Sequence, residues 1–281
     1  MTSLVTTIAP GATVDLAAIS PDPPKGVHKD AAVEELDALT EELGQLQELL
    51  FAAGTRSVLI VLQGMDTSGK DGAIRGVLKD VNPAGCRVAS FKQPSDLELA
   101  HDFLWRVHRQ APERGGMVVF NRSHYEDVVV VRVKELVPPE VWGARYDAIN
   151  AFERLLADAG TIVLKFFLHI DRDEQAERLR AREQEVAKAW KLNAGDWVER
   201  RAWDDYMAAY ADALGRCSTE AAPWHVVPAN KKWLRNLAIT TAIVEALRPL
   251  RAGWLEVLAE RGKTELAAIA DARAAGELGD A

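Results

Sequence analysis

The chain alternates between short, almost wholly apolar runs and longer segments in which apolar residues recur every three or four positions. The short runs are rich in Val, Ile and Leu, as expected for strands buried on both faces of a parallel sheet. The longer segments have the spacing of helices that bury one face. This alternation predicts an α/β fold, with a parallel five-stranded sheet and helices on both faces. The expected strands span residues 57–64, 87–91, 116–121, 161–170 and 224–228.

Helical segments are expected between the strands and near both ends of the chain. Residues 30–53, for example, place Leu36, Leu39, Leu43 and Leu46 at helical spacing on an acidic background. Residues 128–133 favour a strand by their valine content, although they directly follow a polar motif. The expected helices span residues 30–53, 70–80, 96–110, 141–159, 174–188, 196–215 and 231–252.

Three parts are predicted along the chain: an N-terminal arm and helix at residues 1–54, a main domain at 55–252, and a C-terminal helical tail at 253–281. Within the main domain, residues 174–206 have the pattern of two helices joined by a short polar turn, which predicts a mobile lid. The alternative is a solvated helix pair, because residues 171–201 hold eight acidic and eight basic side chains.

Composition narrows the classes of function. The chain has 281 residues, 48% hydrophobic and 27% charged, as in ordinary globular proteins. No apolar run approaches the roughly 20 residues that cross a bilayer, and no secretory signal is evident, so we expect a cytoplasmic protein without membrane partners. The two cysteines form no disulfide framework or metal motif. The net charge is −8, and residues 1–50 hold nine acidic and two basic side chains, so a nucleic-acid partner is not expected.

The strand expected at residues 57–64 runs into a phosphate-binding sequence. Gly64, Gly69 and Lys70 match the pattern G-x-x-x-x-G-K, in which backbone N–H groups surround a phosphate and the lysine reaches its outer oxygens. The helix expected at residues 70–80 would direct its N-terminus at the same anion. The predicted phosphate-binding residues of this loop are Gly64, Met65, Thr67, Ser68, Gly69, Asp71 and Gly72.

Two carboxylates distinguish this loop from the usual pattern. Asp71 stands where a hydroxyl is common, and Asp66 lies inside the loop. Two carboxylates would repel a bare anion, so the loop is expected to take metal-bound phosphate, with Asp66 as the first choice of metal ligand. The alternative for Asp71 is an acid in the first helical turn that the helix dipole stabilises.

A second polar group follows the strand expected at residues 116–121. Asn121, Arg122, Glu126 and Asp127 lie within seven residues there, and so many polar groups at a strand end are costly unless they are solvated or used. Arg122 is expected to bind phosphate with two hydrogen bonds. His124, in the same motif, is either a general base or a hydrogen-bond partner of a neighbouring side chain.

Further cations are candidates for anion contacts. Arg178 and Arg182 are four residues apart and share a helix face, so both could contact a polyanion. Lys92 follows the second expected strand and could meet phosphate or nucleotide; the alternative is a capped turn with Ser95 as the N-cap.

Taken together, these stretches resemble the polyphosphate kinase type 2 family over about residues 59–247. The family consists of P-loop kinases, similar in fold to thymidylate kinase, that move phosphate between inorganic polyphosphate and nucleotides. The resemblance therefore implies a P-loop kinase domain with a helical lid. The motifs that carry the resemblance are GMDTSGKDG (64–72), SFKQP (90–94), AHDFLWRVH (100–108), FNRSHYEDV (120–128), KAWK (188–191), WDDYMAAY (203–210) and APWHVVPANKKWLRNLA (222–238).

The resemblance also implies roles for individual residues. Asp66 would be the metal-linked acid of the loop and Lys70 its phosphate lysine, Arg122 would lie beside the site, and Arg178 and Arg182 would be lid arginines. These five form the predicted catalytic set. Lys191 of the KAWK motif joins Lys92 and Asn121 among the predicted phosphate or nucleotide contacts.

Two departures from the family pattern affect these assignments. Many members read Phe-Asp-Arg-Ser-Trp-Tyr-Asn where this chain has Phe-Asn-Arg-Ser-His-Tyr-Glu, so the strand-end acid is Asn121 and the later Asn is Glu126. Glu126 is therefore the expected second metal ligand, with Asp127 as a further candidate. This form resembles the subgroup that phosphorylates both AMP and ADP. The lid hinge at residues 183–187 also differs from the Asp-Asp-Pro turn of many relatives.

The expected activity is phosphoryl transfer between inorganic polyphosphate and AMP or ADP, giving ADP or ATP, with Mg²⁺ or Mn²⁺ as cofactor. A homo-oligomer, dimer or tetramer, is expected. The alternatives are an ATP-dependent nucleoside monophosphate kinase on the same scaffold and a polyphosphate-binding protein without turnover. The intact Lys70 argues against the second of these.

Overall fold

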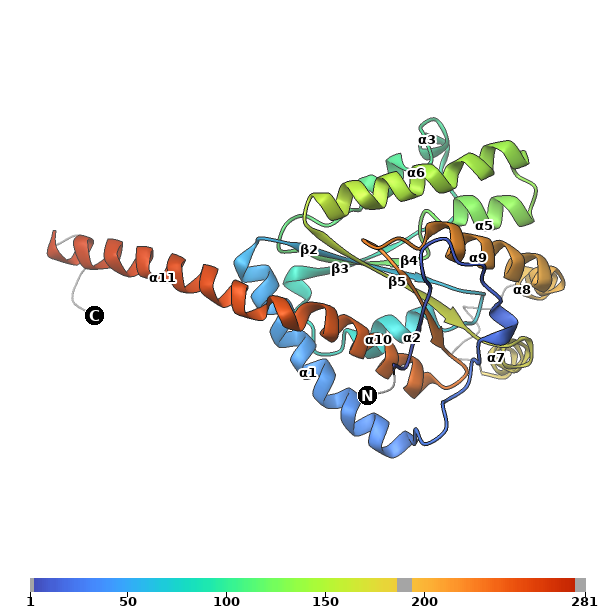
Figure 1. The fold of residues 1–281 in the computed structure, drawn as a ribbon, viewed down its shortest axis with the longest axis horizontal. Coiled ribbons are helices and arrows are strands. Elements are labelled where there is room, and N and C mark those ends of the chain that lie inside the picture. The colour runs from blue at the N-terminus through green and yellow to red at the C-terminus, as the bar shows by residue number, and fades with distance from the viewer. Residues whose placement is uncertain (1–2, 186–193, 276–281) are drawn as a thin grey trace.

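A central sheet of six strands organises the molecule (Figure 1), seen in a computed structural model that describes residues 3–185 and 194–275. The strands are β1 (Thr6–Thr7), β2 (Ser57–Gln63), β3 (Cys86–Ser90), β4 (Met117–Asn121), β5 (Thr161–His169) and β6 (Trp224–Pro228). Their order across the sheet is β1-β6-β5-β2-β4-β3, which places β2 near the centre. The carboxyl end of β2 leads directly into the predicted phosphate loop.

The five strands expected from the sequence are all present, and they pair with one another only in parallel. The prediction of a five-stranded sheet was nevertheless wrong at one edge, because β1 adds a sixth strand antiparallel to β6. Thr6 pairs with Val226 and Thr7 with His225, and the N–H of Ile8 donates to the Trp224 carbonyl at 2.9 Å. Two threonines are too short a run to show an alternating pattern. The strand forms because the edge of β6 offers backbone groups with which it can pair.

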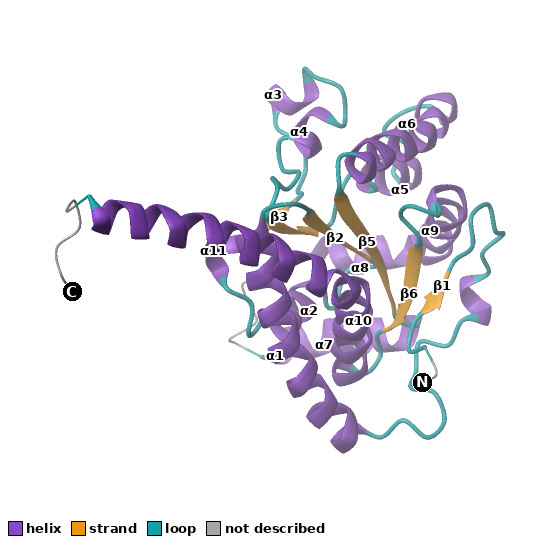
Figure 2. Cartoon of the chain, turned by 60° about the vertical axis from the view of Figure 1, so that its left-hand side comes forward, coloured by secondary structure: helices purple, strands orange, loops and turns teal. Residues whose placement is uncertain are grey.

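Helices cover both faces of the sheet (Figure 2). One face is covered by α1 (Lys29–Ala53), α2 (Lys70–Val77) and α10 (Lys232–Leu247). The other is covered by α5 (Glu126–Val133), α6 (Pro139–Asp158) and α9 (Trp203–Cys217). Beyond the carboxyl end of β5 follow α7 (Arg172–Gln184) and α8 (Ala194–Glu199). Single 3₁₀ turns lie at Leu16–Ala18, Pro83–Gly85, Arg200–Ala202 and Arg248–Leu250.

The expected helices at residues 196–215 and 231–252 are each divided by a 3₁₀ turn, and the structure differs more strongly from the prediction at residues 128–133 and 96–110. The valine-rich residues 128–133 belong to helix α5, in which Glu126 and Asp127 occupy the first turn, where the helix dipole favours acids. Val128 and Val129 are buried on this helix, so packing overrides their strand propensity. Residues 96–110 form two four-residue helices, α3 (Asp96–Leu99) and α4 (Trp105–His108), instead of one.

The break between α3 and α4 has a local cause, since the Asp102 carboxylate accepts from the N–H of Leu104 at 3.0 Å and favours a turn there. At the start of α3 the alternative reading of Ser95 is confirmed. Ser95 and Glu98 form a reciprocal capping box, in which each side chain accepts from the other residue's backbone N–H.

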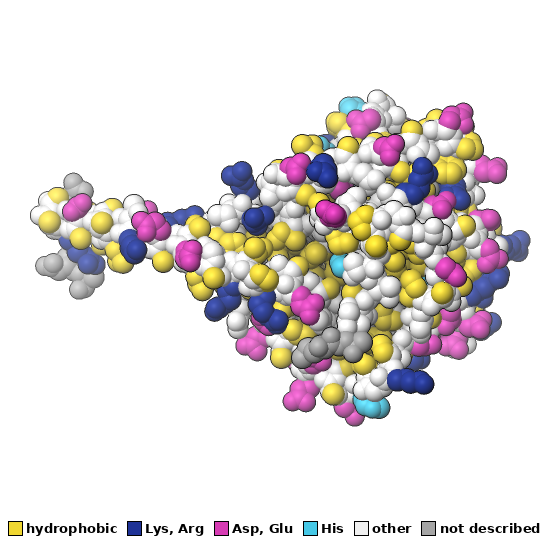
Figure 3. Space-filling model, viewed as in Figure 1, with side chains coloured by type: hydrophobic (Ala, Val, Ile, Leu, Met, Phe, Trp, Pro, Cys, Tyr) yellow, Lys and Arg dark blue, Asp and Glu magenta, His cyan; other side chains and the backbone are white. Residues whose placement is uncertain are grey.

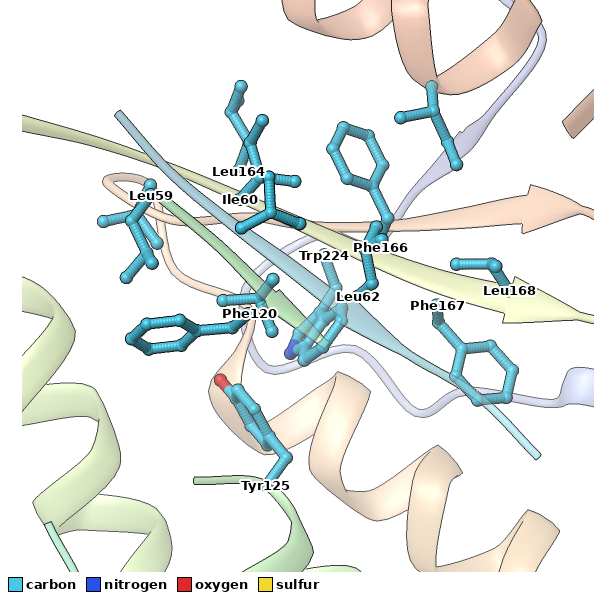
Figure 4. Close-up of a cluster of buried hydrophobic side chains, with 14 of the residues drawn as sticks. Leu59, Ile60, Leu62, Phe120, Tyr125, Leu164, Phe166, Phe167, Leu168 and Trp224 are labelled. Carbon is cyan, nitrogen blue, oxygen red and sulfur yellow. The ribbon is translucent and has the colours of Figure 1, made fainter. Parts of the chain in front are cut away.

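The core lies where β2, β4, β5 and β6 meet the helices. All seven residues of β2 are buried, as a central parallel strand requires. Figure 4 shows the cluster around them, with large side chains contributed by several strands and by the turn before α5. The labelled residues are Leu59, Ile60, Leu62, Phe120, Tyr125, Leu164, Phe166, Phe167, Leu168 and Trp224.

One buried position of β5 carries a cation. Lys165 is fully buried, and its Nζ donates to Glu153 Oε2 at 2.6 Å, to the Tyr125 hydroxyl at 2.9 Å and to the Cys217 carbonyl at 2.5 Å. Glu153 Oε1 in turn accepts from the Tyr125 hydroxyl at 2.8 Å and lies 3.1 Å from His124 Nε2. Burial acts to raise the pKa of Glu153, but Lys165 and His124 together outweigh it and the pKa is lowered.

The last helix of the described residues is α11 (Arg251–Ala274), which projects away from the body (Figures 1 and 3). Near its start Trp254 is buried, and Arg261 donates to the carbonyls of Ala52 and Ala53 at the end of α1. The rest exposes apolar side chains, including Leu266, among charged ones. Within residues 3–185 and 194–275, no helix combines the length and the apolar character needed to cross a membrane.

We predict that Glu153→Leu lowers the free energy of unfolding by about 3–5 kcal/mol, because it leaves Lys165 buried without its carboxylate. Urea denaturation measures the change. The double variant Glu153→Leu with Lys165→Met removes both charges, and should lose clearly less stability than Glu153→Leu alone. Equal losses in the two variants would contradict the ion-pair explanation.

Candidate active site

The phosphate loop requires backbone conformations that favour glycine at both ends. Gly64 has a φ of +147° and Gly69 a φ of +100°. A Cβ at Gly64 would lie 2.7 Å from the Leu168 carbonyl oxygen and 2.9 Å from Ser68 Oγ. Thr67 also has a positive φ, of 68°, which is uncommon for a β-branched residue and marks a strained turn. The chain between β2 and α2 is therefore a tight loop, as the sequence predicts.

Every carbonyl oxygen from Gly64 to Gly69 accepts a hydrogen bond. Lys70 Nζ donates to the carbonyls of Gly64 at 2.7 Å and Met65 at 3.3 Å. Other side chains reach the middle of the loop, where Gln175 Nε2 donates to the Asp66 carbonyl and Arg178 Nη1 to those of Thr67 and Ser68. The Gly69 carbonyl accepts from the N–H of Ala73 in α2. With its carbonyls engaged, the loop can offer N–H groups at the start of α2 to an anion.

Two carboxylates and two cations meet beside the loop. Arg122 Nη2 donates to Asp66 Oδ1 at 2.6 Å, and Arg122 Nη1 lies 3.7 Å from Glu126 Oε2. Gln63 Nε2 donates to Glu126 Oε1 at 3.1 Å. Arg122 has a φ of +61°, an uncommon conformation that directs its side chain from the strand end towards the loop. The structure thus brings together the predicted site residues Asp66, Lys70, Arg122 and Glu126.

The charges of this group shift one another's pKa values. Burial raises the pKa of Asp66, but Lys70 and Arg122 outweigh it, so the pKa is lowered and the carboxylate stays ionised. Burial lowers the pKa of Lys70, against the opposing effect of Asp66. Burial raises the pKa of Glu126, with Arg122 opposing. Burial disfavours the charge of Arg122, yet the carboxylates of Asp66 and Glu126 raise its pKa.

Asn121 and Asp71 also meet at the loop, because Asn121 Nδ2 donates to Asp71 Oδ1 at 2.9 Å.

Asp127 lies against Arg145 and not beside the loop. Arg145 donates to its carbonyl at 3.0 Å and to its Oδ1 at 3.3 Å, and burial raises its pKa. The structure does not bring Asp127 to Asp66, so its predicted metal role gains no support. Lys92 is exposed after β3, and its carbonyl accepts from Arg106.

Of the two roles open to His124, the structure shows the hydrogen bond. Its ring is fully buried, and its Nε2 lies 3.1 Å from Glu153 Oε1 in the network around Lys165. A base that acts on substrate must reach the proton it removes, and this ring lies behind the site.

The predicted lid arginines differ in their contacts. All three nitrogens of the Arg178 guanidinium are engaged, with Nε on Glu174 Oε1, Nη1 on the Thr67 and Ser68 carbonyls and Nη2 on the carbonyls of Ala229 and Asn230. Arg178 thus supports the loop from behind, and phosphate contact by this residue stays a prediction. Arg182 pairs instead with Asp196 of α8, with Nη1 to Oδ2 at 3.0 Å. Lys191 lies outside the described residues.

A small pocket opens between the loop and α8, with about 30 Å³ of free space, enough for a few water molecules at most. Sequence reasoning missed several residues that line it. Tyr206 and Tyr210 are one helical turn apart in the WDDYMAAY motif, and that spacing was the signal that could have found them. The pocket is lined by Gly64, Met65, Asp66, Arg122, Glu126, Val130, Gln175, Asp196, Glu199, Tyr206 and Tyr210.

The donor set of this pocket fits a hard divalent cation. Asp66 and Glu126 both face Arg122, so one cation already lies between the two carboxylates. Mg²⁺ commonly binds one or two carboxylates and completes its shell with water and substrate phosphates. Within the part of the chain that the structure describes, no group of three or more His, Cys, Asp and Glu side chains is arranged to hold a metal. A metal here would therefore need oxygen ligands from the substrate.

Comparison with known proteins identifies the family. Residues 26–251 match the sequence model of the family described as Polyphosphate kinase 2. The chain belongs to the polyphosphate kinase 2 family. That match contains every residue predicted for the site, from Gly64 to Lys191, and ends where α11 begins.

Similar proteins within the polyphosphate kinase 2 family extend over most of the chain. The AMP/ADP-polyphosphate phosphotransferase of Meiothermus ruber is 53% identical over 86% of this chain and 92% of its own length. The ADP-polyphosphate phosphotransferase of Rhodopseudomonas palustris is 45% identical over 82% of this chain and 84% of its own length. The crystal structure of polyphosphate kinase 2 from Arthrobacter aurescens TC1 superposes with a TM-score of 0.83 at 43% identity, over 85% of this chain and 87% of that chain.

We predict that Gly64→Ala destabilises the protein by about 1–3 kcal/mol, because the new Cβ meets the Leu168 carbonyl and the φ is unfavourable for alanine. Urea denaturation measures the loss. Gly143→Ala is the matched control, since it lies in α6 with no atom within 4 Å of its Cβ position. The control should be neutral or slightly stabilising; a loss as large as that of Gly64→Ala would contradict the steric argument.

Proposed function

We propose that the protein transfers a phosphoryl group between inorganic polyphosphate and AMP or ADP, to give ADP or ATP. The observation that carries the proposal is the phosphate loop itself, with every carbonyl from Gly64 to Gly69 engaged and Lys70 in place beside Asp66 and Arg122. Relatives that carry the names of AMP/ADP- and ADP-polyphosphate phosphotransferases support the choice of donor and acceptor.

Positioning and charge neutralisation carry the proposed reaction. The acceptor of AMP or ADP is already an anionic phosphate oxygen, so little base catalysis is needed. This agrees with the buried location of His124. Lys70 and the N–H groups at the start of α2 would hold the transferred phosphoryl group, and Arg122 would contact it after exchanging partners with Asp66.

We propose Mg²⁺, with Mn²⁺ as a substitute, as the cofactor. Asp66 and Glu126 would hold it, together with substrate oxygens, and the metal would neutralise negative charge on the phosphates. The lowered pKa of Asp66 keeps one of these carboxylates ionised for this role. Asp127, paired with Arg145, is the weaker candidate for a metal ligand.

The proposed lid must open to admit substrates, because the pocket under α8 leaves only about 30 Å³ free. Asp196 of α8 pairs with Arg182, while burial and the charge of Asp66 raise its pKa. A phosphate chain that binds Arg182 would compete with Asp196 and release α8 from this position.

Lys191 and Lys92 remain proposed contacts of the polyphosphate or nucleotide. A homo-oligomer and the absence of a nucleic-acid partner stay predictions; the face in Figure 3 carries acidic and basic side chains intermixed.

The experiment that tests this function supplies one phosphate donor at a time. The protein is incubated with Mg²⁺ and either AMP or ADP, and with either polyphosphate or ATP as the donor, and the nucleotides are separated and quantified. Product with polyphosphate supports the proposal. Product with ATP alone would indicate a nucleoside monophosphate kinase, and binding of polyphosphate without product a protein that lacks turnover.

We predict that Lys70→Ala lowers the turnover number by about 10²-fold or more, equal to roughly 2.7 kcal/mol in the barrier, because the phosphoryl group loses its neutralising cation. Asp66→Asn should cause a loss of the same order. Lys79→Ala is the control, since Lys79 pairs with Asp37 at the surface. A folded Lys70→Ala or Asp66→Asn variant with a near-normal rate would refute the role assigned to that residue.

We predict that Glu126→Gln weakens the dependence of the rate on Mg²⁺, because one of the two metal-binding carboxylates is lost. The measurement is a titration of the initial rate with Mg²⁺ at saturating substrates. Asp127→Asn is the matched comparison, since Asp127 faces Arg145 and should leave the half-saturating Mg²⁺ concentration unchanged. If the Glu126→Gln titration coincides with that of the unchanged protein, Glu126 is not a ligand.

A further inference from the structure

A buried arginine from α10 lies against the phosphate loop and is not among the predicted site residues. Arg235 is only 2% exposed. Its Nη1 lies 2.1 Å from the position that a Cβ on Gly69 would occupy, and its Nη2 lies 3.1 Å from the corresponding position at Gly72. Helices α2 and α10 pack side by side in Figures 1 and 2. The guanidinium therefore sits directly behind the first turn of α2.

The contacts of Arg235 leave its charge unneutralised. Its Nε and Nη2 both donate to Oδ1 of Asn236, a neutral amide, at 3.1 and 2.8 Å. Among residues 3–185 and 194–275, no carboxylate forms an ion pair with it. Burial and the nearby charge of Arg178 lower the pKa of Arg235 to about 10, which still leaves it protonated near neutral pH. Two guanidinium groups thus meet behind Gly69, since Arg178 Nη1 lies 3.5 Å from the same Cβ position.

Burying these two guanidinium groups side by side makes the folded protein less stable. A buried charge without a counter-charge destabilises a protein, and two like charges side by side add repulsion. Arg178 offsets part of this cost through four backbone carbonyls and Glu174, whereas Arg235 contacts only the Asn236 amide within the described part of the chain. A negative charge nearby would balance the guanidinium groups of Arg178 and Arg235. The loop in front of them can bind an anion through its N–H groups.

We propose that Arg235 is a positioning residue for phosphoryl transfer, whose buried positive charge strengthens the binding of a terminal phosphate on the opposite side of Gly69 and Gly72. This inference rests on the proposed function, since it takes the phosphate of polyphosphate or nucleotide as the anion. Arg235 acts through the loop and does not touch the phosphate, because its side chain is covered. The glycines at positions 69 and 72 serve the same end, by letting the guanidinium approach the backbone closely.

The test separates a role in anion binding from a role in packing. Arg235→Met keeps a long side chain but removes the charge, and Arg235→Lys keeps the charge. We expect Arg235→Met to bind inorganic tripolyphosphate about tenfold more weakly, which corresponds to roughly 1.4 kcal/mol. Its melting temperature should be unchanged or higher, because an unpaired buried charge has been removed. Arg235→Lys should recover most of the affinity.

Titration calorimetry with tripolyphosphate and Mg²⁺ measures the affinity, and thermal unfolding without ligand measures stability. The KM for polyphosphate should rise in Arg235→Met more than kcat falls. Arg248→Met is the control, since Arg248 is exposed after α10 and pairs with Glu42. An Arg235→Met variant that binds as tightly as the unchanged protein would overturn the inference. So would a lower melting temperature with no recovery of affinity in Arg235→Lys, because that pattern indicates packing. If the unchanged protein binds no tripolyphosphate, the proposed function itself fails.

Discussion

The site depends on the hydrogen bonding of six consecutive carbonyls, from Gly64 to Gly69. Each of these oxygens accepts a bond from within the protein, and the donors come from Lys70, Gln175, Arg178 and the backbone. A backbone loop carries donors and acceptors in equal number, so a loop can favour an anion only if its acceptors are satisfied elsewhere. These donors supply that condition. They fix the loop in a strained conformation that short sequence signals alone would not maintain.

Charged side chains form two groups around the sheet, one partly exposed and the other fully buried. Arg122, Asp66 and Glu126 form one group above the carboxyl ends of β2 and β4, and Lys165 and Glu153 form another behind them. The second group fixes the turn that carries Arg122, because Glu153 contacts both His124 and Tyr125, two and three residues further on. Removing Glu153 or Lys165 would leave a buried charge without its partner and destabilise the protein, whereas Arg122 is partly exposed and its pairs with Asp66 and Glu126 contribute less.

The sequence predicted those features that depend on short-range patterns. Five parallel strands, the loop at Gly64 and the cap at Ser95 follow from apolar runs, glycine spacing and capping chemistry. Features that depend on tertiary packing were missed. The valines of α5 carry strand propensity that burial overrode, and β1 needs the open edge of β6. Arg178 and Arg182 occupy the same helix face, so no spacing rule shows that the Nη groups of Arg178 donate to loop carbonyls while Arg182 pairs with an acid of α8.

The position of α8 follows from a competition between charges. Asp196 belongs to α8 and lies close enough to Asp66 for its pKa to rise, so repulsion between two acids opposes this position while Arg182 favours it. Burial also raises the pKa of Asp196, and opening would return the carboxylate to water. The position of α8 in the structure thus depends on the Arg182–Asp196 pair, and the proposed binding of a phosphate chain at Arg182 would weaken that pair.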